Sequence, residues 1–240
     1  MNLVLHLSLW ALVGCSLSVS PAHAVSVPYS ESFDSTNQNW KNSVSNLSQD
    51  ATRVSGGGPG GAGDAFIEST FTTPTSGTPS SAQVWFRARS TVNSSNNEFF
   101  GDWVTENVTR IGLWVRHDAA TPLSLGLRIP TSMGFPAMLG RFPDPIQPNV
   151  WTLLSMDIND TNPELLDETG PTHNNFNPVF SNVTYLQLFA NLSGLPNSTT
   201  VHFDLDRVTI VPEPSTWLMA GFGLPALGLT IRARRRRRAA

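Results

Sequence analysis

Residues 110–118 read RIGLWVRHD, a stretch in which every second side chain is aliphatic. The aliphatic positions are Ile111, Leu113 and Val115, and the positions between them hold glycine and tryptophan. Successive side chains of a β-strand point to opposite faces of a sheet, so this spacing gives one aliphatic face and one mixed face. The stretch therefore predicts a β-strand that packs one face against a core.

The same two-residue period recurs along the chain, whereas the sequence shows no strong 3.6-residue period and no internal repeat. Segments rich in Gly, Pro, Ser and Thr, such as 55–64 and 73–81, separate the periodic stretches and are typical of turns. About nine to eleven strands at this spacing predict an all-β fold, an antiparallel β-sandwich, with a short helix at 163–167. The other periodic stretches are AQVWFRARS at 82–90, PLSLGLRIP at 122–130, WTLLSMDI at 151–158 and TYLQLFA at 184–190.

Six arginines close to the C-terminal end dominate the charge pattern of the 240-residue chain. Setting residues 212–240 aside leaves nine basic and 17 acidic residues, a net charge near −8, with Lys41 as the sole lysine. This balance lacks the basic footprint of a nucleic-acid-binding protein. The sequence predicts one sandwich domain at 25–211, preceded by a signal segment at 1–24.

Residues 1–24 read MNLVLHLSLWALVGCSLSVSPAHA and resemble a secretory signal peptide, because an apolar stretch precedes the small-residue site AHA at 22–24. We expect signal peptidase to cleave after Ala24. A lipoprotein route stays open, since LVGC at 12–15 resembles a lipoprotein box in which Cys15 is lipidated. Cys15 is the only cysteine, so cleavage after Ala24 leaves a chain that forms no disulfide.

The C-terminal segment has three parts: a Pro-Glu-Pro motif, an uncharged apolar stretch and an arginine cluster. Pro212, Glu213 and Pro214 form a stiff break, because proline lacks an amide donor and fixes φ. Residues 217–231 carry no charge and predict a short transmembrane helix, below the roughly 20 apolar residues of a full span. The arginines within 232–238 are expected on the cytoplasmic side.

This arrangement at 212–240 resembles the PEP-CTERM tail of Gram-negative bacteria, which an exosortase recognises and removes. Proteins with such tails are typically exported by species that make extracellular polysaccharide. The resemblance implies that the membrane holds the protein transiently during sorting. It further implies a final location at the cell surface or in the extracellular matrix.

The predicted first and last strands resemble those of galactose-binding-like jelly rolls, a fold shared by many carbohydrate-binding modules. The similar segments are ESFDSTNQNW at 31–40 and VHFDLDRVTIV at 201–211, and a legume-lectin-like sandwich is the main competing fold. In related modules, carboxylates of the first and last strands bind a structural calcium ion. The resemblance implies calcium at Glu31 and Asp206, with Asp204 as a further ligand, and calcium prefers such oxygen ligands.

Aromatic and arginine side chains gather on the strand faces opposite the aliphatic ones. If these faces form one outer surface, the rings can stack on sugars and the guanidinium groups can bind hydroxyls or carboxylates. The sequence therefore predicts a polysaccharide-binding surface, with internal packing of the same side chains as the alternative. The predicted binding residues are Trp85, Arg87, Arg89, Trp114, Arg116, Arg128, Trp151 and Tyr185, with Asp157 and Gln187 on the same face.

Signs of catalysis are weak. Residues 164–168, ELLDE, resemble the paired acids of a glycosidase, but a retaining glycosidase needs its carboxyl groups about 5 Å apart on one face. The glycine-rich segment 55–64 lacks the lysine and the following helix of a phosphate-binding loop. We therefore expect a non-catalytic exported protein that binds or structures extracellular polysaccharide. The alternatives are a secreted glycan hydrolase and a purely structural matrix protein without a ligand.

Overall fold

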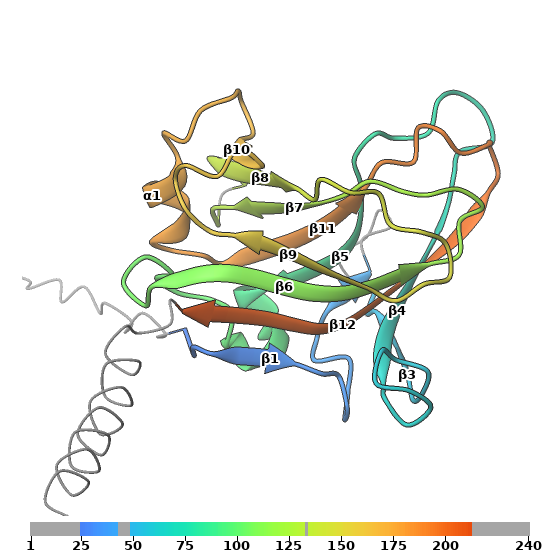
Figure 1. Cartoon of the computed structure of the whole chain (residues 1–240), viewed down its shortest axis with the longest axis horizontal. Helices are drawn as coiled ribbons and strands as arrows, with labels where there is room; N and C mark the ends of the chain where they lie inside the picture. The colour runs from blue at the N-terminus through green and yellow to red at the C-terminus, as the bar shows by residue number, and fades with distance from the viewer. Residues whose placement is uncertain (1–24, 43–48, 133, 213–240) are drawn as a thin grey trace, which may run out of the picture.

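The computed structural model describes residues 25–42, 49–132 and 134–212. In this part of the chain, twelve strands form two six-stranded antiparallel sheets that face each other (Figure 1). The predicted antiparallel β-sandwich is confirmed, and the strand count exceeds the prediction because several strands have only two or three residues. The signal segment 1–24 and the tail 213–240 lie outside the described residues.

The first sheet, sheet A, is built around its long strand β12. Its order is β3-β4-β12-β6-β9, and β1 pairs with β12 beyond the end of β4. The strands are β1 (Tyr29–Glu31), β3 (Thr52–Val54), β4 (Phe66–Thr72), β6 (Val108–His117), β9 (Thr152–Asp157) and β12 (Thr200–Pro212).

The second sheet, sheet B, carries the order β10-β8-β7-β11-β5-β2. Its strands are β2 (Lys41–Asn42), β5 (Gln83–Arg89), β7 (Leu125–Pro130), β8 (Ala137–Arg141), β10 (Leu165–Asp167) and β11 (Tyr185–Ala190). The described helical elements are short, namely η1 (Ser90–Val92), η2 (Ser94–Asn97) and α1 (Phe176–Phe180).

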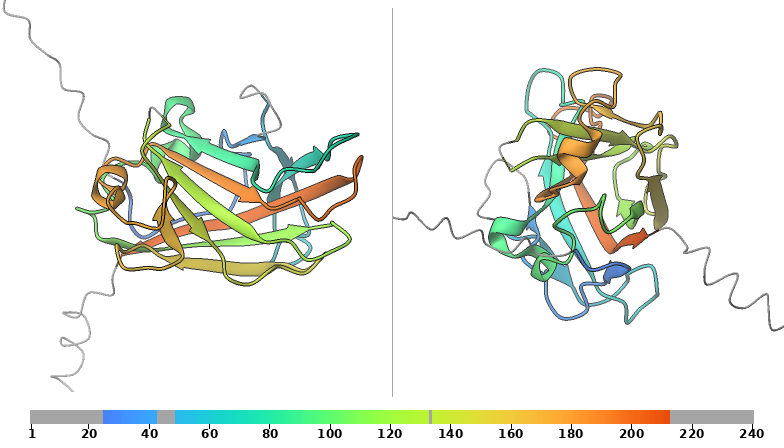
Figure 2. Two further views of the ribbon diagram at one scale, coloured as in Figure 1. Left: turned by 90° about the horizontal axis from the view of Figure 1, so that it is seen from above. Right: turned by 90° about the vertical axis from the view of Figure 1, so that its left-hand side faces the viewer.

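The chain passes repeatedly from one sheet to the other. After β4 in sheet A it enters β5 in sheet B, returns to β6, crosses to β7 and β8, and returns again to β9. Neighbours within a sheet are therefore mostly distant in sequence, as in a jelly roll. Figure 2 shows the two layers from above and from one side.

The aliphatic faces of both sheets meet in one core. Ile111, Leu113 and Val115 are at most 1% exposed, so the alternation at 110–118 is confirmed. Burial of such side chains supplies the main favourable free energy of folding. Two aromatic side chains from opposite sheets meet in this core. Trp85 of β5 stacks on Phe203 of β12, with ring centroids 4.5 Å apart.

The predicted helix at 163–167 is wrong. Leu165–Asp167 instead forms β10, which pairs with β8 at the edge of sheet B. Leu165 is fully buried, and it lies opposite Gly140, where the missing side chain leaves room in the core. Pairing to an exposed strand edge and burial of this leucine outweigh the local preference for a helical turn.

Both ends of the described chain lie at one end of the sandwich (Figure 1). Tyr29 of β1 pairs with Ile210 of β12, so the residues that follow the signal segment adjoin those that precede the Pro-Glu-Pro motif. Within the described ranges, no helix has the length and apolar character needed to cross a membrane. The predicted transmembrane stretch 217–231 falls outside those ranges.

Candidate functional site

A groove of about 830 Å³ crosses the outer face of sheet B, opposite the core. Strand register places Arg87, Gln187, Arg128 and Leu139 in one row across β5, β11, β7 and β8. All four residues line the groove. Side chains two positions apart on a strand share a face, so the next row adds Phe189 and Arg141.

The centre of the groove is aromatic. Gly126 on β7 lies beside Phe189 on β11, and a Cβ atom at Gly126 would stand only 2.2 Å from Phe189 Cζ. The missing side chain therefore lets the phenyl ring lie flat across the neighbouring strand. Phe189 is half-buried, so part of the ring faces the groove.

Arg128 is locked by a network of hydrogen bonds. Its Nε donates to Glu168 Oε1 at 2.8 Å and its Nη2 donates to Glu168 Oε2 at 2.6 Å, which is a bidentate ion pair. Its Nη1 donates to Gln187 Oε1 at 3.2 Å, and its Nη2 also donates to the Gly134 carbonyl at 2.7 Å. Arg128 thus orders the floor of the groove and has little donor capacity left for a ligand.

Two further arginines meet at Tyr185. The Arg89 guanidinium lies 4.0 Å from the centre of the Tyr185 ring, and its Nη2 donates to the Tyr185 hydroxyl. Arg87 lies on the same side, with Cζ 6.0 Å from that ring centre. The Nε atoms of Arg87 and Arg89 are buried and have no hydrogen-bond partner among the described residues.

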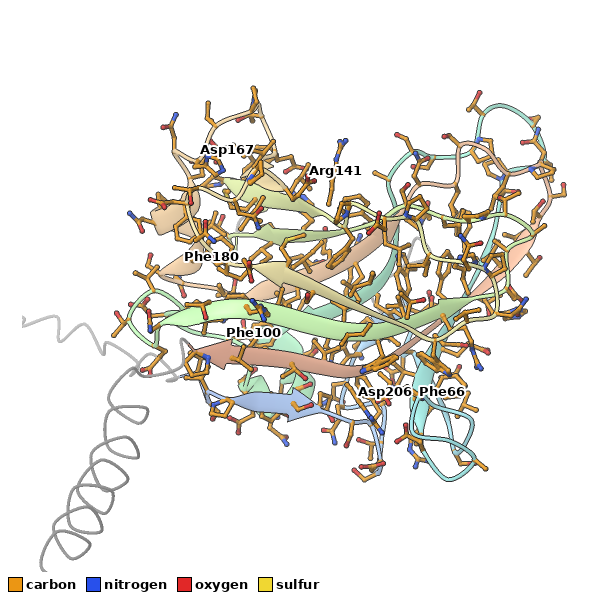
Figure 3. The ribbon with its side chains drawn as sticks, in the orientation of Figure 1. Phe66, Phe100, Arg141, Asp167, Phe180 and Asp206 are labelled. Atoms are coloured by element: carbon orange, nitrogen blue, oxygen red, sulfur yellow. The ribbon has the colours of Figure 1, made fainter. Side chains whose placement is uncertain are left out.

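The far side of the groove carries a free cation and a free carboxylate. Arg141 is exposed at the end of β8, where its side chain projects outward (Figure 3). Neither its guanidinium nor the carboxylate of Glu164 forms a hydrogen bond or an ion pair within the described part of the chain. Both residues line the groove and are therefore open to a ligand.

The predicted binding residues do not form one surface. Arg87, Arg89, Arg128 and Tyr185 lie on sheet B, together with Gln187. The other members lie on the opposite sheet or in the core, and these are Trp85, Trp114, Arg116, Trp151 and Asp157. The expectation of a single outer surface is therefore wrong, and sugar binding stays a prediction for the sheet B residues.

Trp85 faces the core, against the prediction that it lies on the outer surface. The register between β5 and β11 shifts at Leu188 and Phe189, directly opposite Trp85. Such a bulge adds one residue to a strand and shifts the alternation of its side chains. Trp85 and Phe86 consequently both point inward, and each is at most 1% exposed.

On sheet A, the predicted residues pack against one another and a neighbouring loop. Arg116 Cζ lies 4.8 Å from the ring centre of Trp151 and 5.2 Å from that of Phe66, and its Nε donates to Asp204 at 2.7 Å. Trp151 Nε1 donates to the Gly57 carbonyl at 2.9 Å, which holds the glycine-rich segment. These contacts support the packing alternative for Arg116 and Trp151.

The predicted calcium ligands lie on two faces of sheet A. Glu31 is paired in register with core-facing Val208, whereas Asp204 and Asp206 alternate with the core residues Phe203 and Leu205 and point to the outer face. The Glu31 carboxylate accepts hydrogen bonds from two neighbours in the chain, the Tyr29 hydroxyl and the Phe33 backbone amide.

Asp204 is likewise occupied, because its Oδ2 accepts from Arg116. Only Asp206 offers two buried oxygens without a hydrogen-bond partner among the described residues. Across those residues, no group of three or more His, Cys, Asp or Glu side chains could hold a metal ion. As placed, Glu31, Asp204 and Asp206 do not form a ligand set, and calcium stays a prediction.

Among the groove residues that the prediction missed are Arg141 and Phe189. Arg141 ends a segment without a clear two-residue period, because Gly140 occupies a core-facing position. Phe189 shares the outer face with Tyr185 and Gln187, because the extra residue of the bulge, Trp85, lies on β5 and leaves the alternation of β11 intact. Its place in the run TYLQLFA does carry the signal, since 185, 187 and 189 form one alternating set.

Comparison with known proteins gives one sequence match and several structural similarities. Residues 211–237 match the family model of the PEP-CTERM protein-sorting motif. No curated protein matches the chain.

One similar structure is the family 11 carbohydrate-binding module from Clostridium thermocellum, in complex with a β-1,3-1,4-mixed-linked tetrasaccharide. Its sequence identity to this chain is 13% and the TM-score is 0.45. The alignment covers 79% of this chain and 97% of the module. A second is the family 30 carbohydrate-binding module of the cellulosomal cellulase Cel9D-Cel44B of the same organism, at 10% identity and a TM-score of 0.42. This alignment covers 80% of this chain and 97% of the module.

The CBM22-1–GH10 modules of the Clostridium thermocellum xylanase Xyn10B, complexed with xylohexaose, are similar at 13% identity and a TM-score of 0.44. The alignment covers 77% of this chain but only 28% of the longer xylanase chain. Such values are too low to assign a ligand. The sorting motif, in contrast, implies export and processing by exosortase. The chain is therefore a jelly-roll β-sandwich protein that carries a PEP-CTERM protein-sorting motif.

Proposed function

We propose that this protein acts outside the cell as a polysaccharide-binding protein, released by exosortase at the cell surface or into the matrix. The groove on sheet B carries the proposal. It is about 830 Å³ in volume and open along the sheet, which suits a segment of a linear polymer. Its aromatic centre at Phe189 offers a stacking surface, and the polar groups around it can fix the orientation of sugar hydroxyls.

The groove is also ordered in advance. Arg128 is held by Glu168, Gln187 and Gly134. Side chains fixed in this way lose little conformational entropy when a ligand binds, which favours affinity.

A glycan hydrolase is the second candidate, because Glu164 and Glu168 flank β10 and both line the groove. Both Glu168 oxygens, however, accept hydrogen bonds from Arg128, so this carboxylate is not free for proton transfer to a substrate. We therefore favour binding without turnover.

Affinity electrophoresis of the purified full-length protein in gels that contain soluble polysaccharides tests the proposal. We expect at least one neutral or acidic polysaccharide to retard the protein. Phe189→Ala should weaken that retardation about tenfold, because one ring is lost from the centre of the site. Leu153→Ala is the matched control, since Leu153 is 56% exposed on sheet A.

Absence of retardation by every polysaccharide, or equal retardation of the Phe189→Ala variant with an unchanged thermal unfolding curve, would refute the groove as a binding site. Incubation of the retarding polysaccharide with the protein, followed by a reducing-end assay, tests the second candidate. Release of reducing ends that Glu164→Gln abolishes would establish a hydrolase instead.

A further inference from the structure

The charges that remain unpaired in the groove are mainly positive. Arg128 and Glu168 neutralise each other, which leaves the cations Arg87 and Arg141 against the single free carboxylate of Glu164. Arg89 lies outside the groove lining, on the Tyr185 ring that Arg87 also approaches, and adds positive charge nearby. The predicted domain as a whole carries a net negative charge, so its net charge is opposite in sign to the unpaired charge of the groove.

Arg87 is the more informative of the two free cations. Its Nε atom is buried without a hydrogen-bond partner among the described residues. Leaving a buried donor of a charged group unsatisfied is costly. Because Arg87 lines the groove, an anion bound to the terminal nitrogens of its guanidinium would compensate this cost. A guanidinium group matches a carboxylate in shape and binds it through two parallel hydrogen bonds.

Arg141 stands three strands away from Arg87 within the same sheet, with β11 and β7 between them. At the usual strand spacing this places the two residues roughly 14 Å apart across the sheet. One small anion cannot reach both. A polymer with carboxylates at repeated intervals can engage both cations at once and gains effective concentration by doing so.

We propose that the groove binds an acidic polysaccharide, with one sugar carboxylate held by Arg87 and a second carboxylate, further along the same polymer, held by Arg141. This inference rests on the proposed function and adds the substrate class to it. Glu164 accepts a sugar hydroxyl at the far end of the groove.

The test compares polygalacturonate with its carboxyl-reduced form, a galactan of the same length. Binding to full-length protein is measured by titration calorimetry and by affinity electrophoresis. We expect the acidic polymer to bind at least tenfold more tightly than the reduced one, and more tightly than monomeric galacturonate. Its affinity should fall as salt rises from about 50 to 500 mM, because charge attraction is screened.

Substitutions of the two arginines test whether the preference for the acidic polymer arises in the groove. Arg87→Gln should weaken binding of the acidic polymer at least tenfold, Arg141→Gln a few-fold, and neither should change binding of the reduced polymer. Arg87→Lys keeps the charge and the fold but loses the planar fork, so an intermediate affinity is expected. Arg110→Gln is the control, since this arginine is exposed on sheet A and paired with Asp157.

Equal affinity for the acidic and reduced polymers, lost together in Phe189→Ala, would overturn the acidic substrate class and leave polysaccharide binding intact. No binding of either polymer, or of any other polysaccharide, would overturn both proposals. Acid-selective binding that survives in both arginine variants would place the site elsewhere and also overturn the inference.

Discussion

At the level of single residues, Arg116 connects several side chains on the outer face of sheet A. Its guanidinium lies against the rings of Phe66 and Trp151 and forms an ion pair with Asp204, whose side chain is only 8% exposed. Burial raises the pKa of Asp204 to about 6, and the hydrogen bond from Arg116 counteracts this rise. The arginine therefore both fills space and compensates a buried charge.

Arg116→Met should lower the free energy of unfolding by about 3 kcal/mol at pH 8, because it leaves the Asp204 charge buried and unpaired. Urea denaturation measures this loss. Arg110→Met is the matched control, since the Arg110–Asp157 pair is more than half exposed and should change stability by about 0.5 kcal/mol or less. A loss of the same size in both variants would refute the role assigned to Arg116.

Asp206 is the second buried carboxylate of β12. Neither of its oxygens has a hydrogen-bond partner of normal geometry among the described residues, and the residue is fully buried. Burial raises its pKa to about 7 and the nearby Asp64 and Asp34 carboxylates contribute, while Arg207, with Nε 3.6 Å from Oδ2, offsets only part of the rise.

Asp206→Asn should stabilise the protein at pH 8, by about 1 kcal/mol or more. The folded state holds the proton up to about pH 7, whereas the unfolded state releases it near pH 4. Stability from this group is therefore fully present below about pH 4 and is lost as pH rises through 7. Thermal unfolding from pH 4 to 8 should show a shallower decline in the variant.

The same experiment tests calcium. If Asp206 binds a calcium ion, its substitution by Asn lowers the melting temperature at pH 8, and a chelator lowers that of the unchanged protein. Either result would contradict the expected gain in stability. Added calcium should leave the melting temperature unchanged in the absence of a site.

At the level of elements, Gly126 of β7 leaves room for the Phe189 ring of β11, because it has no side chain. An added Cβ atom would meet the Phe189 ring at 2.2 Å and the Gly140 carbonyl oxygen at 2.7 Å. The second contact is with backbone of β8, which cannot move without disturbing sheet B. The position of the ring in the groove therefore depends on this glycine.

Gly126→Ala should destabilise the protein by about 1–3 kcal/mol, as overpacked positions do. It should also weaken polysaccharide binding, because the Phe189 ring is displaced. Gly112→Ala provides the comparison, since its added Cβ atom would meet only the Leu154 carbonyl oxygen at 3.7 Å, an ordinary contact. A neutral effect at both glycines, measured by urea denaturation, would show that the Phe189 ring and the Gly140 carbonyl can move aside without cost.

The elements also show what the sequence could and could not reveal. Ile111, Leu113 and Val115 were predictable, because period-two spacing depends only on the strand itself. Trp85 was not, since its orientation depends on a bulge opposite β11. The row of Arg87, Gln187 and Arg128 depends on register between distant segments, which no local pattern specifies. The faces of regular strands could thus be assigned, but not the orientation of a residue at a bulge or which faces share a groove.

For the whole molecule, sorting makes a prediction about both ends of the chain. In a host with an exosortase, the mature protein should begin at Val25 and end close to the Pro-Glu-Pro motif. Intact mass spectrometry of surface and medium fractions measures this directly. Replacement of Glu213 and Pro214 by alanine should leave the arginine cluster attached. A retained tail in the unchanged protein, or a lipid mass on Cys15, would contradict the processing scheme.

The central position of β12 bears on how the domain responds to force. Thr200–Pro212 is hydrogen-bonded to β6 on one side and to β4 and then β1 on the other. Whenever the chain is held by its C-terminal segment, a pull enters the sandwich along this strand. The load then acts in shear on both flanking ladders together, whereas an edge strand would be peeled away one bond at a time. A domain tethered in this way resists flow or cell movement with the hydrogen bonds of both ladders at once.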